Sequence, residues 1–125
     1  MARLLIVEDN PDLLEILERL FGEAHEVATA QRGDEAIERA SERRPDLVIL
    51  DMQLPVLDGR EVGLRIKEHY AADPVPILIL TALAQTTDPE ELLASGCCDR
   101  YLAKPAPLDD IRTNVEELLE QGPAS

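Results

Sequence analysis

Leu47-Val48-Ile49-Leu50-Asp51 is a run of four large aliphatic residues that ends on a carboxylate. Two further runs, Leu4-Leu5-Ile6-Val7 and Ile77-Leu78-Ile79-Leu80, have the same composition and are also followed by polar residues. None of the three runs alternates between apolar and polar residues, as a strand with one wet face would. They therefore predict strands that are buried on both faces, which is typical of a parallel sheet between two layers of helices.

Segments of helical length separate these strands from one another and from two weaker ones, Glu26–Ala30 and Arg100–Ala103. Asn10 followed by Pro11 predicts a helix start, because asparagine caps the free N–H groups of the first turn and proline is preformed for its first position. The first two helices are expected from Pro11 to about Phe21 and from Gly33 to Arg43, and the third from the end of the Asp51–Gly59 loop to about Tyr70. The fourth is expected to begin at a cap, either Thr87 or Asp88, and to end at the stop signal Gly96. The fifth begins at about Leu108.

Five strands alternating with five helices predict an α/β fold with one doubly wound, five-stranded parallel sheet. Right-handed crossovers favour the strand order 2-1-3-4-5, a flavodoxin-like (βα)5 arrangement whose switch point lies between the first and third strands. The length of 125 residues suits one domain, which we place at residues 1–121, with residues 122–125 as a flexible C-terminal end.

The composition excludes several classes of function. Acidic residues number 26 against 12 basic ones, and the net charge of −14 repels phosphate backbones, so we expect no direct nucleic-acid binding. The longest apolar run, Val75–Leu80, is too short to span a bilayer, and no signal-peptide pattern opens the chain. Cys97 and Cys98 are adjacent and cannot staple distant segments, which favours loop cysteines over a redox pair and fits a cytoplasmic protein.

Three carboxylates follow the strands that flank the switch point. Glu8 and Asp9 follow the first strand and Asp51 follows the third, and the carboxyl ends of parallel strands meet at one edge of the sheet. Like charges so close together repel one another unless a cation lies between them. An all-oxygen site with few protein ligands suits Mg²⁺. The alternative is that these residues are ordinary helix caps, which explains one such carboxylate better than three.

A hydroxyl and an ammonium are expected at the same edge. Thr81 follows the fourth strand, and Lys104, with Pro105 after it, follows the fifth. An incoming phosphoryl group needs such partners, since the ammonium and the metal neutralise its oxygens and the hydroxyl donates a hydrogen bond. Lys104 alone is better explained as a salt-bridge partner of the acidic cluster than as a catalytic group, and both interpretations place it beside Asp51.

From Arg3 to Leu119 the chain resembles the receiver domain of the two-component response regulators, in a single-domain, chemotaxis-regulator-like form. The resemblance depends on motifs that stand in the family's order at the ends of the first, third, fourth and fifth strands. They are Val7-Glu8-Asp9-Asn10, Leu50-Asp51-Met52-Gln53-Leu54-Pro55 with Asp58-Gly59, Thr81-Ala82, and Tyr101-Leu102-Ala103-Lys104-Pro105.

The resemblance implies a phosphoacceptor signalling switch. Asp51 stands where the family accepts a phosphoryl group from a sensor histidine kinase or a histidine phosphotransfer protein, after which the surface toward an effector protein changes. The family assists its own phosphotransfer and slow dephosphorylation without being an enzyme by name. The other implied site residues are Asp9 as a direct Mg²⁺ ligand, Glu8 as a ligand through water, Gln53 as a ligand through its backbone carbonyl, Lys104 and Thr81 at the phosphoryl group, and Thr81 with Tyr101 as the switch pair.

The chain departs from the family's pattern at three places. Glu8 replaces a frequent aspartate, which lengthens that arm, and Leu54 replaces a methionine of similar volume. The segment Gly96–Tyr101 is one residue longer than usual, which leaves the orientation of its tyrosine open. Two other classes of protein fit less well. A dehalogenase-type phosphatase needs an aspartate where Gln53 stands, and the carboxylates after the first strand would repel the phosphate of a flavodoxin-like electron carrier.

The first expected helix carries a wider apolar stripe than one core-facing side needs, so either the helix is deeply buried or one edge is exposed for a partner. His25 and His69 have no metal-ligand spacing and are expected to be solvated. The cognate kinase, the effector and the oligomeric state stay open, as does whether the chain stands alone or belongs to a longer protein. The stripe consists of Leu13, Leu14, Ile16, Leu17, Leu20 and Phe21.

Overall fold

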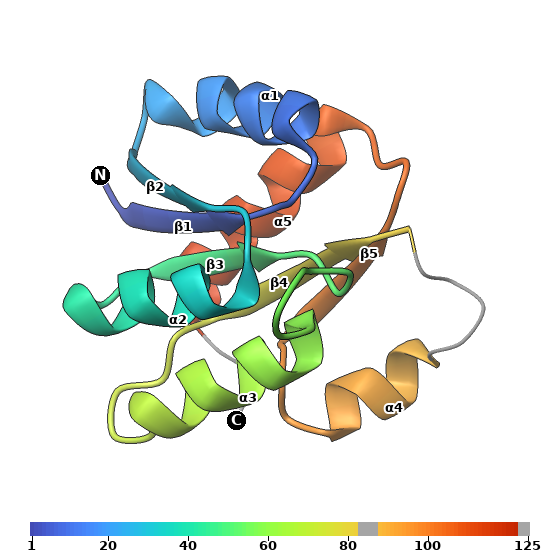
Figure 1. The fold of residues 1–125 in the computed structure, drawn as a ribbon. Helices are drawn as coiled ribbons and strands as arrows, with labels where there is room; N and C mark the ends of the chain where they lie inside the picture. Colours follow the sequence, from blue (N-terminus) through green and yellow to red (C-terminus); the bar gives the residue numbers. More distant parts are fainter. Residues whose placement is uncertain (83–87, 123–125) are drawn as a thin grey trace.

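The computed structural model describes residues 1–82 and 88–122. Five strands form one sheet in the order β2-β1-β3-β4-β5, and every neighbouring pair is parallel (Figure 1). This confirms the predicted α/β fold and strand order. The elements in chain order are β1 (Arg3–Val7), α1 (Pro11–Gly22), β2 (Glu26–Ala30), α2 (Gly33–Glu42), β3 (Leu47–Leu50), α3 (Gly59–His69), β4 (Ile77–Thr81), α4 (Pro89–Ala94), β5 (Arg100–Ala103) and α5 (Leu108–Gln121).

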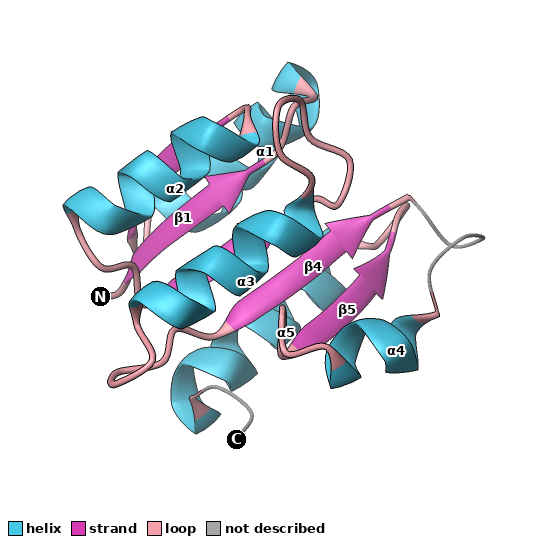
Figure 2. Cartoon of the chain, turned by 60° about the horizontal axis from the view of Figure 1, so that its bottom comes forward, coloured by secondary structure: helices cyan, strands magenta, loops and turns pink. Residues whose placement is uncertain are grey.

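The sheet lies between two helical layers, with α1 and α5 on one face and α2, α3 and α4 on the other (Figures 1 and 2). Successive residues of a strand point to opposite faces, so each central strand contributes to both layers. In β3, Leu47 and Ile49 pack in the core under α1 and α5 (the α1–α5 core), whereas Val48 and Leu50 pack in the core under α2, α3 and α4 (the α2–α4 core). All four are at most 1 % exposed, which explains why this run is apolar throughout.

Side-chain caps set the starts of α1, α3 and α4. Asn10 Oδ1 accepts hydrogen bonds from two N–H groups of the first turn of α1, at 2.9 and 3.3 Å, which confirms the predicted start at Pro11. Asp58 caps α3 and Asp88 caps α4 in the same way. The alternative cap for α4, Thr87, lies outside the described residues.

Several element ends differ from the expectation by one residue. β4 continues through Thr81, because Thr81 pairs with Ala103 of β5. α2 ends at Glu42, since Arg43 adopts an extended conformation with φ −155° and ψ 123°. α3 ends at His69. The shift in β4 matters most, because it places the Thr81 hydroxyl on a strand that is hydrogen-bonded on both sides rather than on a loop.

An ion pair that the sequence did not predict ties α3 to the segment before β5. Lys67 Nζ lies 2.6 Å from Asp99 Oδ2 and 2.7 Å from the carbonyl oxygen of Val75. The same Asp99 oxygen accepts the N–H of Ile77 at 2.7 Å, and the N–H of Asp99 donates to the Ile77 carbonyl at 2.8 Å. The Asp99 side chain is only 3 % exposed. These contacts hold the chain ahead of β5 against the start of β4.

The apolar stripe of α1 combines the two predicted alternatives. Leu14, Leu17 and Phe21 are buried in the α1–α5 core, whereas Ile16 is 45 % exposed on the outer edge.

No described helix is both long enough and apolar enough to cross a membrane.

The histidines and cysteines differ in how far they match the expectation. His69 is exposed, as expected, but His25 is half-buried and its Nδ1 accepts a hydrogen bond from the N–H of Ala2 at 3.0 Å. The prediction that His25 is solvated is therefore wrong, because the start of the chain pairs with the entry to β2. Cys97 and Cys98 are free thiols in the segment between α4 and β5, and both are buried.

Candidate functional site

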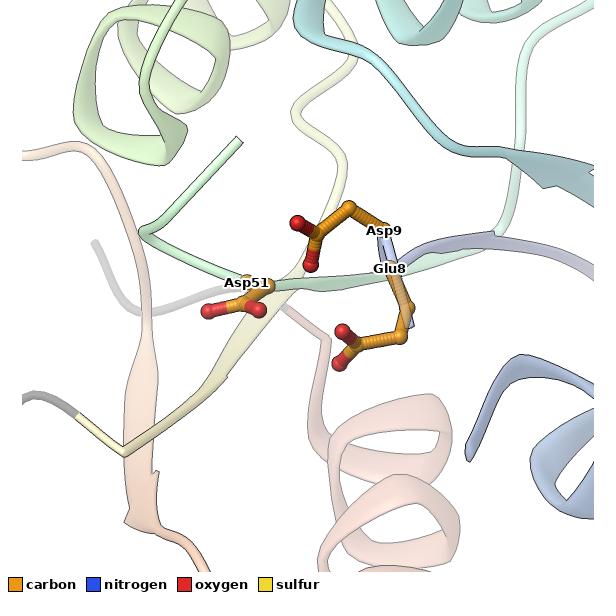
Figure 3. A group of neighbouring side chains, drawn as sticks. All are labelled: Glu8, Asp9 and Asp51. Atoms are coloured by element: carbon orange, nitrogen blue, oxygen red, sulfur yellow. The ribbon is translucent and has the colours of Figure 1, made fainter. Parts of the chain in front are cut away.

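Two adjacent strands place three carboxylates at the carboxyl edge of the sheet. β1 and β3 pair in a register that sets Val7 against Leu50, so the residues that follow each strand emerge side by side. Glu8 and Asp9 follow β1 and Asp51 follows β3. One oxygen from each of the three side chains lies within 4.8 Å of the others, and Figure 3 shows the three carboxylates gathered at the strand ends. The predicted convergence of Glu8, Asp9 and Asp51 is therefore present.

The three carboxylates differ in their access to solvent. Glu8 and Asp51 are 2 % and 4 % exposed, whereas Asp9 is exposed. Backbone N–H groups hold the two buried ones, since the N–H of Asn10 donates to Glu8 Oε2 at 3.1 Å and that of Gln53 donates to Asp51 Oδ1 at 3.2 Å. The buried pair is thus fixed in place, and Asp9 forms the solvent side of the cluster.

Lys104 extends from the end of β5 into the cluster. Its Nζ lies 2.6 Å from Glu8 Oε1 and 3.1 Å from Asp51 Oδ2. The N–H of Lys104 donates to the carbonyl oxygen of Thr81 at 2.8 Å, which continues the pairing of β5 with β4, and the peptide bond from Lys104 to Pro105 is cis. The expected ion pair with the acidic cluster is present, and its shorter contact is to Glu8.

The preference of Lys104 for Glu8 is a feature that sequence reasoning missed. The longer arm of glutamate was noted as a departure from the family's pattern, and it is this arm that reaches the ammonium. The two residues are 96 positions apart, so only the strand order brings them together. The longer arm of Glu8 is visible in the sequence, but its contact with Lys104 depends on the strand order.

The cluster changes the acid–base properties of two of its members. Burial raises the pKa of the Glu8 carboxyl above its ordinary 4.5, and the charge of Asp51 adds to this effect, while the hydrogen bond from Lys104 opposes it. Burial alone would lower the pKa of Lys104, but the hydrogen bond to Glu8 and the charge of Asp51 outweigh it, so this pKa lies above 10.5. Lys104 is therefore a fixed ammonium at neutral pH.

Thr81 and Tyr101, the predicted switch pair, lie on neighbouring strands. Thr81 is the last residue of β4 and is fully buried at this edge. Tyr101 pairs with Ile79 across β4 and β5, and its half-buried ring packs against the α2–α4 core. Ahead of β5, Cys97 and Cys98 are buried, and β5 pairs with β4 from Arg100 to Ala103.

The loop after β3 passes very close to α3 at Gly59. The N–H of Gly59 donates to the carbonyl oxygen of Met52 at 2.9 Å. A Cβ on Gly59 would lie 2.2 Å from the carbonyl oxygen of Asp51, so no larger residue fits without moving the backbone of the acidic cluster. Gln53 lies on this loop with its side chain exposed, two residues after Asp51.

The residues present fit the divalent cation that the sequence predicts. The donors are carboxylate oxygens only, which is the set that Mg²⁺ prefers over softer metals. Three carboxylates face one ammonium, so the cluster carries excess negative charge that a cation would offset. Exposed Asp9 leaves one side open to water, and magnesium normally retains several water ligands.

Comparison with known proteins agrees with this arrangement. The family model of the response regulator receiver domain matches residues 4–116. The transcriptional regulatory protein PrrA of Mycobacterium tuberculosis is 40% identical over 122 residues, which cover 95% of this chain and 50% of PrrA. The polar-differentiation response regulator DivK of Brucella anthropi is 35% identical over 102 residues, covering 81% of this chain and 82% of DivK. The chain spans about half the length of the first transcriptional regulators it matches.

Solved structures show the same fold. The receiver domain of a sensor histidine kinase from Pseudomonas aeruginosa, with a magnesium ion coordinated in its active site cleft, superimposes with a TM-score of 0.84 at 31% identity. That comparison covers 95% of this chain and 98% of the other. A CheY-like receiver domain protein from Methanospirillum hungatei gives a TM-score of 0.88 at 21% identity, over 97% of this chain and 95% of that one, which supports the fold alone.

Proposed function

The chain belongs to the response regulator receiver domain family, and we propose that it is a phosphoacceptor switch whose Asp51 accepts a phosphoryl group from a histidine kinase or a histidine phosphotransfer protein. The placement of Asp51 is the observation that supports this most. Asp51 is 4 % exposed at the end of a central strand, and its carboxylate lies within 4.8 Å of two further carboxylates and 3.1 Å from the ammonium of Lys104.

In the proposed reaction an oxygen of Asp51 attacks the phosphorus of a phosphohistidine. A P–O bond to the carboxylate forms, the P–N bond breaks, and its electron pair stays on the imidazole nitrogen. Lys104 offsets the charge of the transferred oxygens, and the N–H of Gln53 orients the carboxylate through Oδ1. The Thr81 hydroxyl donates a hydrogen bond to the transferred group.

Asp9, Asp51 and the backbone carbonyl of Gln53 are proposed to hold Mg²⁺, with Glu8 acting through water. The metal, when bound, supplies positive charge for the oxygens of the phosphoryl group. Glu8 is suited to an indirect role, because both of its carboxylate oxygens already accept hydrogen bonds, from Lys104 and from the N–H of Asn10.

The signal is proposed to leave the site through β4 and β5. A phosphoryl group on Asp51 draws the Thr81 hydroxyl toward it, and Tyr101 on the next strand then turns inward. The surface of α4, β5 and α5 changes as a result. A ligand shifts such an equilibrium only through contacts that differ between the two states, and the hydrogen bond to Thr81 is such a contact.

Residues 1–121 form the proposed receiver unit, and its place of action is proposed to be the cytoplasm. Of the expected flexible end, residues 123–125 lie outside the described residues. The partners are the phosphodonor protein and an effector protein, without direct contact to nucleic acid. The unit is proposed to assist its own phosphorylation and slow dephosphorylation rather than to act as an enzyme. Gln53 supports this, because an aspartate-based phosphatase uses a second carboxylate at that position.

The test is phosphate uptake followed by intact mass. With acetyl phosphate and Mg²⁺, the wild-type chain should gain one phosphoryl group and Asp51→Asn should gain none. Asp58→Asn is the matched control, because asparagine also caps α3 and this aspartate lies outside the cluster. Undiminished uptake by Asp51→Asn would show that the acceptor is another residue.

A further inference from the structure

The loop between β3 and α3, which follows Asp51, contains a strained turn. The N–H of Leu57 donates to the carbonyl oxygen of Pro55 at 2.9 Å, across Val56 with a φ of 74°. Such a three-residue hydrogen bond around a positive φ defines the rarer and more strained form of the γ-turn. Among residues 1–82 and 88–122, Val56 is the one non-glycine residue with a positive φ.

Valine is poorly suited to this conformation. Its β-branched side chain crowds the backbone when φ is positive, whereas glycine adopts such angles readily and asparagine does so more easily than most residues. Val56 gains little within the chain in return, because it is 67 % exposed. Its neighbours Leu54 and Leu57 differ, since both are half-buried and pack against the α2–α4 core.

The shape of the turn is imposed by backbone contacts on either side of Val56. The N–H of Gly33, at the start of α2, donates to the carbonyl oxygen of Pro55 at 3.1 Å. α2 begins so close to the loop that a Cβ on Gly33 would lie 2.3 Å from the carbonyl oxygen of Leu57. These contacts would hold the turn equally well around a glycine. The valine side chain is therefore not needed for the fold.

The exposed valine belongs to the loop that follows Asp51. The loop leaves β3 directly after Asp51 and stands at the carboxyl edge of the sheet (Figure 1). A phosphohistidine reaches Asp51 only if the protein surface around that histidine covers this edge. Strained residues persist where the surrounding structure holds them in place, and they cluster at functional sites. An exposed apolar side chain at this edge suits an apolar contact.

We propose that Val56 is a specificity-determining contact for the histidine-bearing phosphodonor, and that the strained turn presents its side chain to an apolar residue beside the phosphohistidine. The proposal rests on the proposed function of Asp51. It concerns recognition of the donor protein and leaves the chemistry of the site to the residues already described.

The test compares three variants with two donors. Val56→Gly removes the side chain and the strain, Val56→Asn replaces the apolar side chain with one that tolerates a positive φ, and Val56→Ala removes most of the side chain and keeps much of the strain. The donors are acetyl phosphate and an autophosphorylated histidine kinase domain. The kinase is the one that transfers fastest to the wild-type chain in a panel of purified kinases.

Uptake from acetyl phosphate should match wild type in all three variants, because a small donor does not touch the loop. The kcat/KM for transfer from the kinase should fall about tenfold in each variant, mainly through KM, as expected for the loss of one buried valine contact. Val56→Gly should also unfold at a temperature about 3–6 °C above wild type, because the strain is relieved.

Wild-type transfer from the kinase in Val56→Gly and Val56→Ala would overturn the proposal, and so would a Val56→Gly protein that is no more stable than wild type. An equal loss with both donors would also overturn it, because the loop would then act on the site itself. A wild-type chain that takes phosphate from neither donor would instead refute the proposed function of Asp51.

Discussion

Replacing Lys67 with methionine removes the ammonium from the buried pair with Asp99 while keeping a side chain of similar length. The lysine side chain is 18 % exposed and the aspartate side chain 3 %, and Lys67 Nζ lies 2.6 Å from Asp99 Oδ2. The carboxylate therefore cannot turn to solvent when its cation is lost. The substitution also removes the hydrogen bond from Nζ to the carbonyl oxygen of Val75. The loss of stability therefore has two parts. The buried Asp99 carboxylate loses the Lys67 ammonium, and the carbonyl oxygen of Val75 loses the Nζ donor.

The expected cost follows from these two parts. Removing one partner of a buried ion pair typically lowers the free energy of unfolding by about 3–5 kcal/mol. A domain of 125 residues has a total of about 6–19 kcal/mol, so the Lys67→Met protein should remain folded but unfold about 10–20 °C lower. Arg65→Met is the matched control on the same helix, because its ion pair with Glu61 is half exposed and contributes at most about 0.5 kcal/mol after solvent screening.

Urea unfolding followed by far-ultraviolet circular dichroism measures the cost, and the chain has no tryptophan to offer a fluorescence signal. The double variant Lys67→Met/Asp99→Asn should regain about half of the lost stability, since the amide is neutral and still accepts the N–H of Ile77. The interpretation of Lys67 and Asp99 as a stabilising buried ion pair is wrong if Lys67→Met lowers the free energy of unfolding no more than Arg65→Met does. It is also wrong if the double variant is less stable than Lys67→Met.

Three further predictions concern the site. Burial raises the pKa of Glu8 above 4.5 in the folded state. At pH values between 4.5 and this raised pKa, the folded protein therefore binds more protons than the unfolded one. The metal-free protein should therefore lose stability as the pH rises from 4.5 through the raised pKa, and Glu8→Gln should weaken this slope in urea titrations at a series of pH values. Asp9→Ala should lower Mg²⁺ affinity by about tenfold or more in calorimetric titration, and equal affinity would place the metal elsewhere. Thr81→Ala should still take phosphate on Asp51 but show a smaller change in amide exchange over residues 88–108 with beryllofluoride, and a wild-type change would exclude coupling through this hydroxyl.

The sequence predicted the strands and the site edge well because both depend on short local patterns. A continuous apolar run such as Leu47–Leu50 is explained only by burial on both faces, and the polar residue after it then has to lie at the carboxyl edge. The positions of Asp51 and Lys104 follow from strand order alone. The resemblance to receivers then supplied roles for these residues that spacing could not supply.

The contacts that were missed depend on distances rather than patterns. Lys67 and Asp99 are 32 residues apart, and each looks like an ordinary surface charge in its own segment. His25 was expected in solvent because nothing in the sequence indicates that the N–H of Ala2 lies beside it. The positive φ of Val56 could not be predicted from the sequence either, since β-branched residues such as valine rarely adopt it.

The alternation of side chains along the central strands has a consequence for how this chain can change. Leu17 of α1 and Ile66 of α3 belong to cores on opposite faces of the sheet and share no apolar cluster. Substitutions at such a pair should combine additively, whereas those within one core should not. Each helical layer is thus an independent unit of variation. Substitutions in α1 and α5 can therefore adapt that layer to a new partner without changing which residues the opposite layer tolerates.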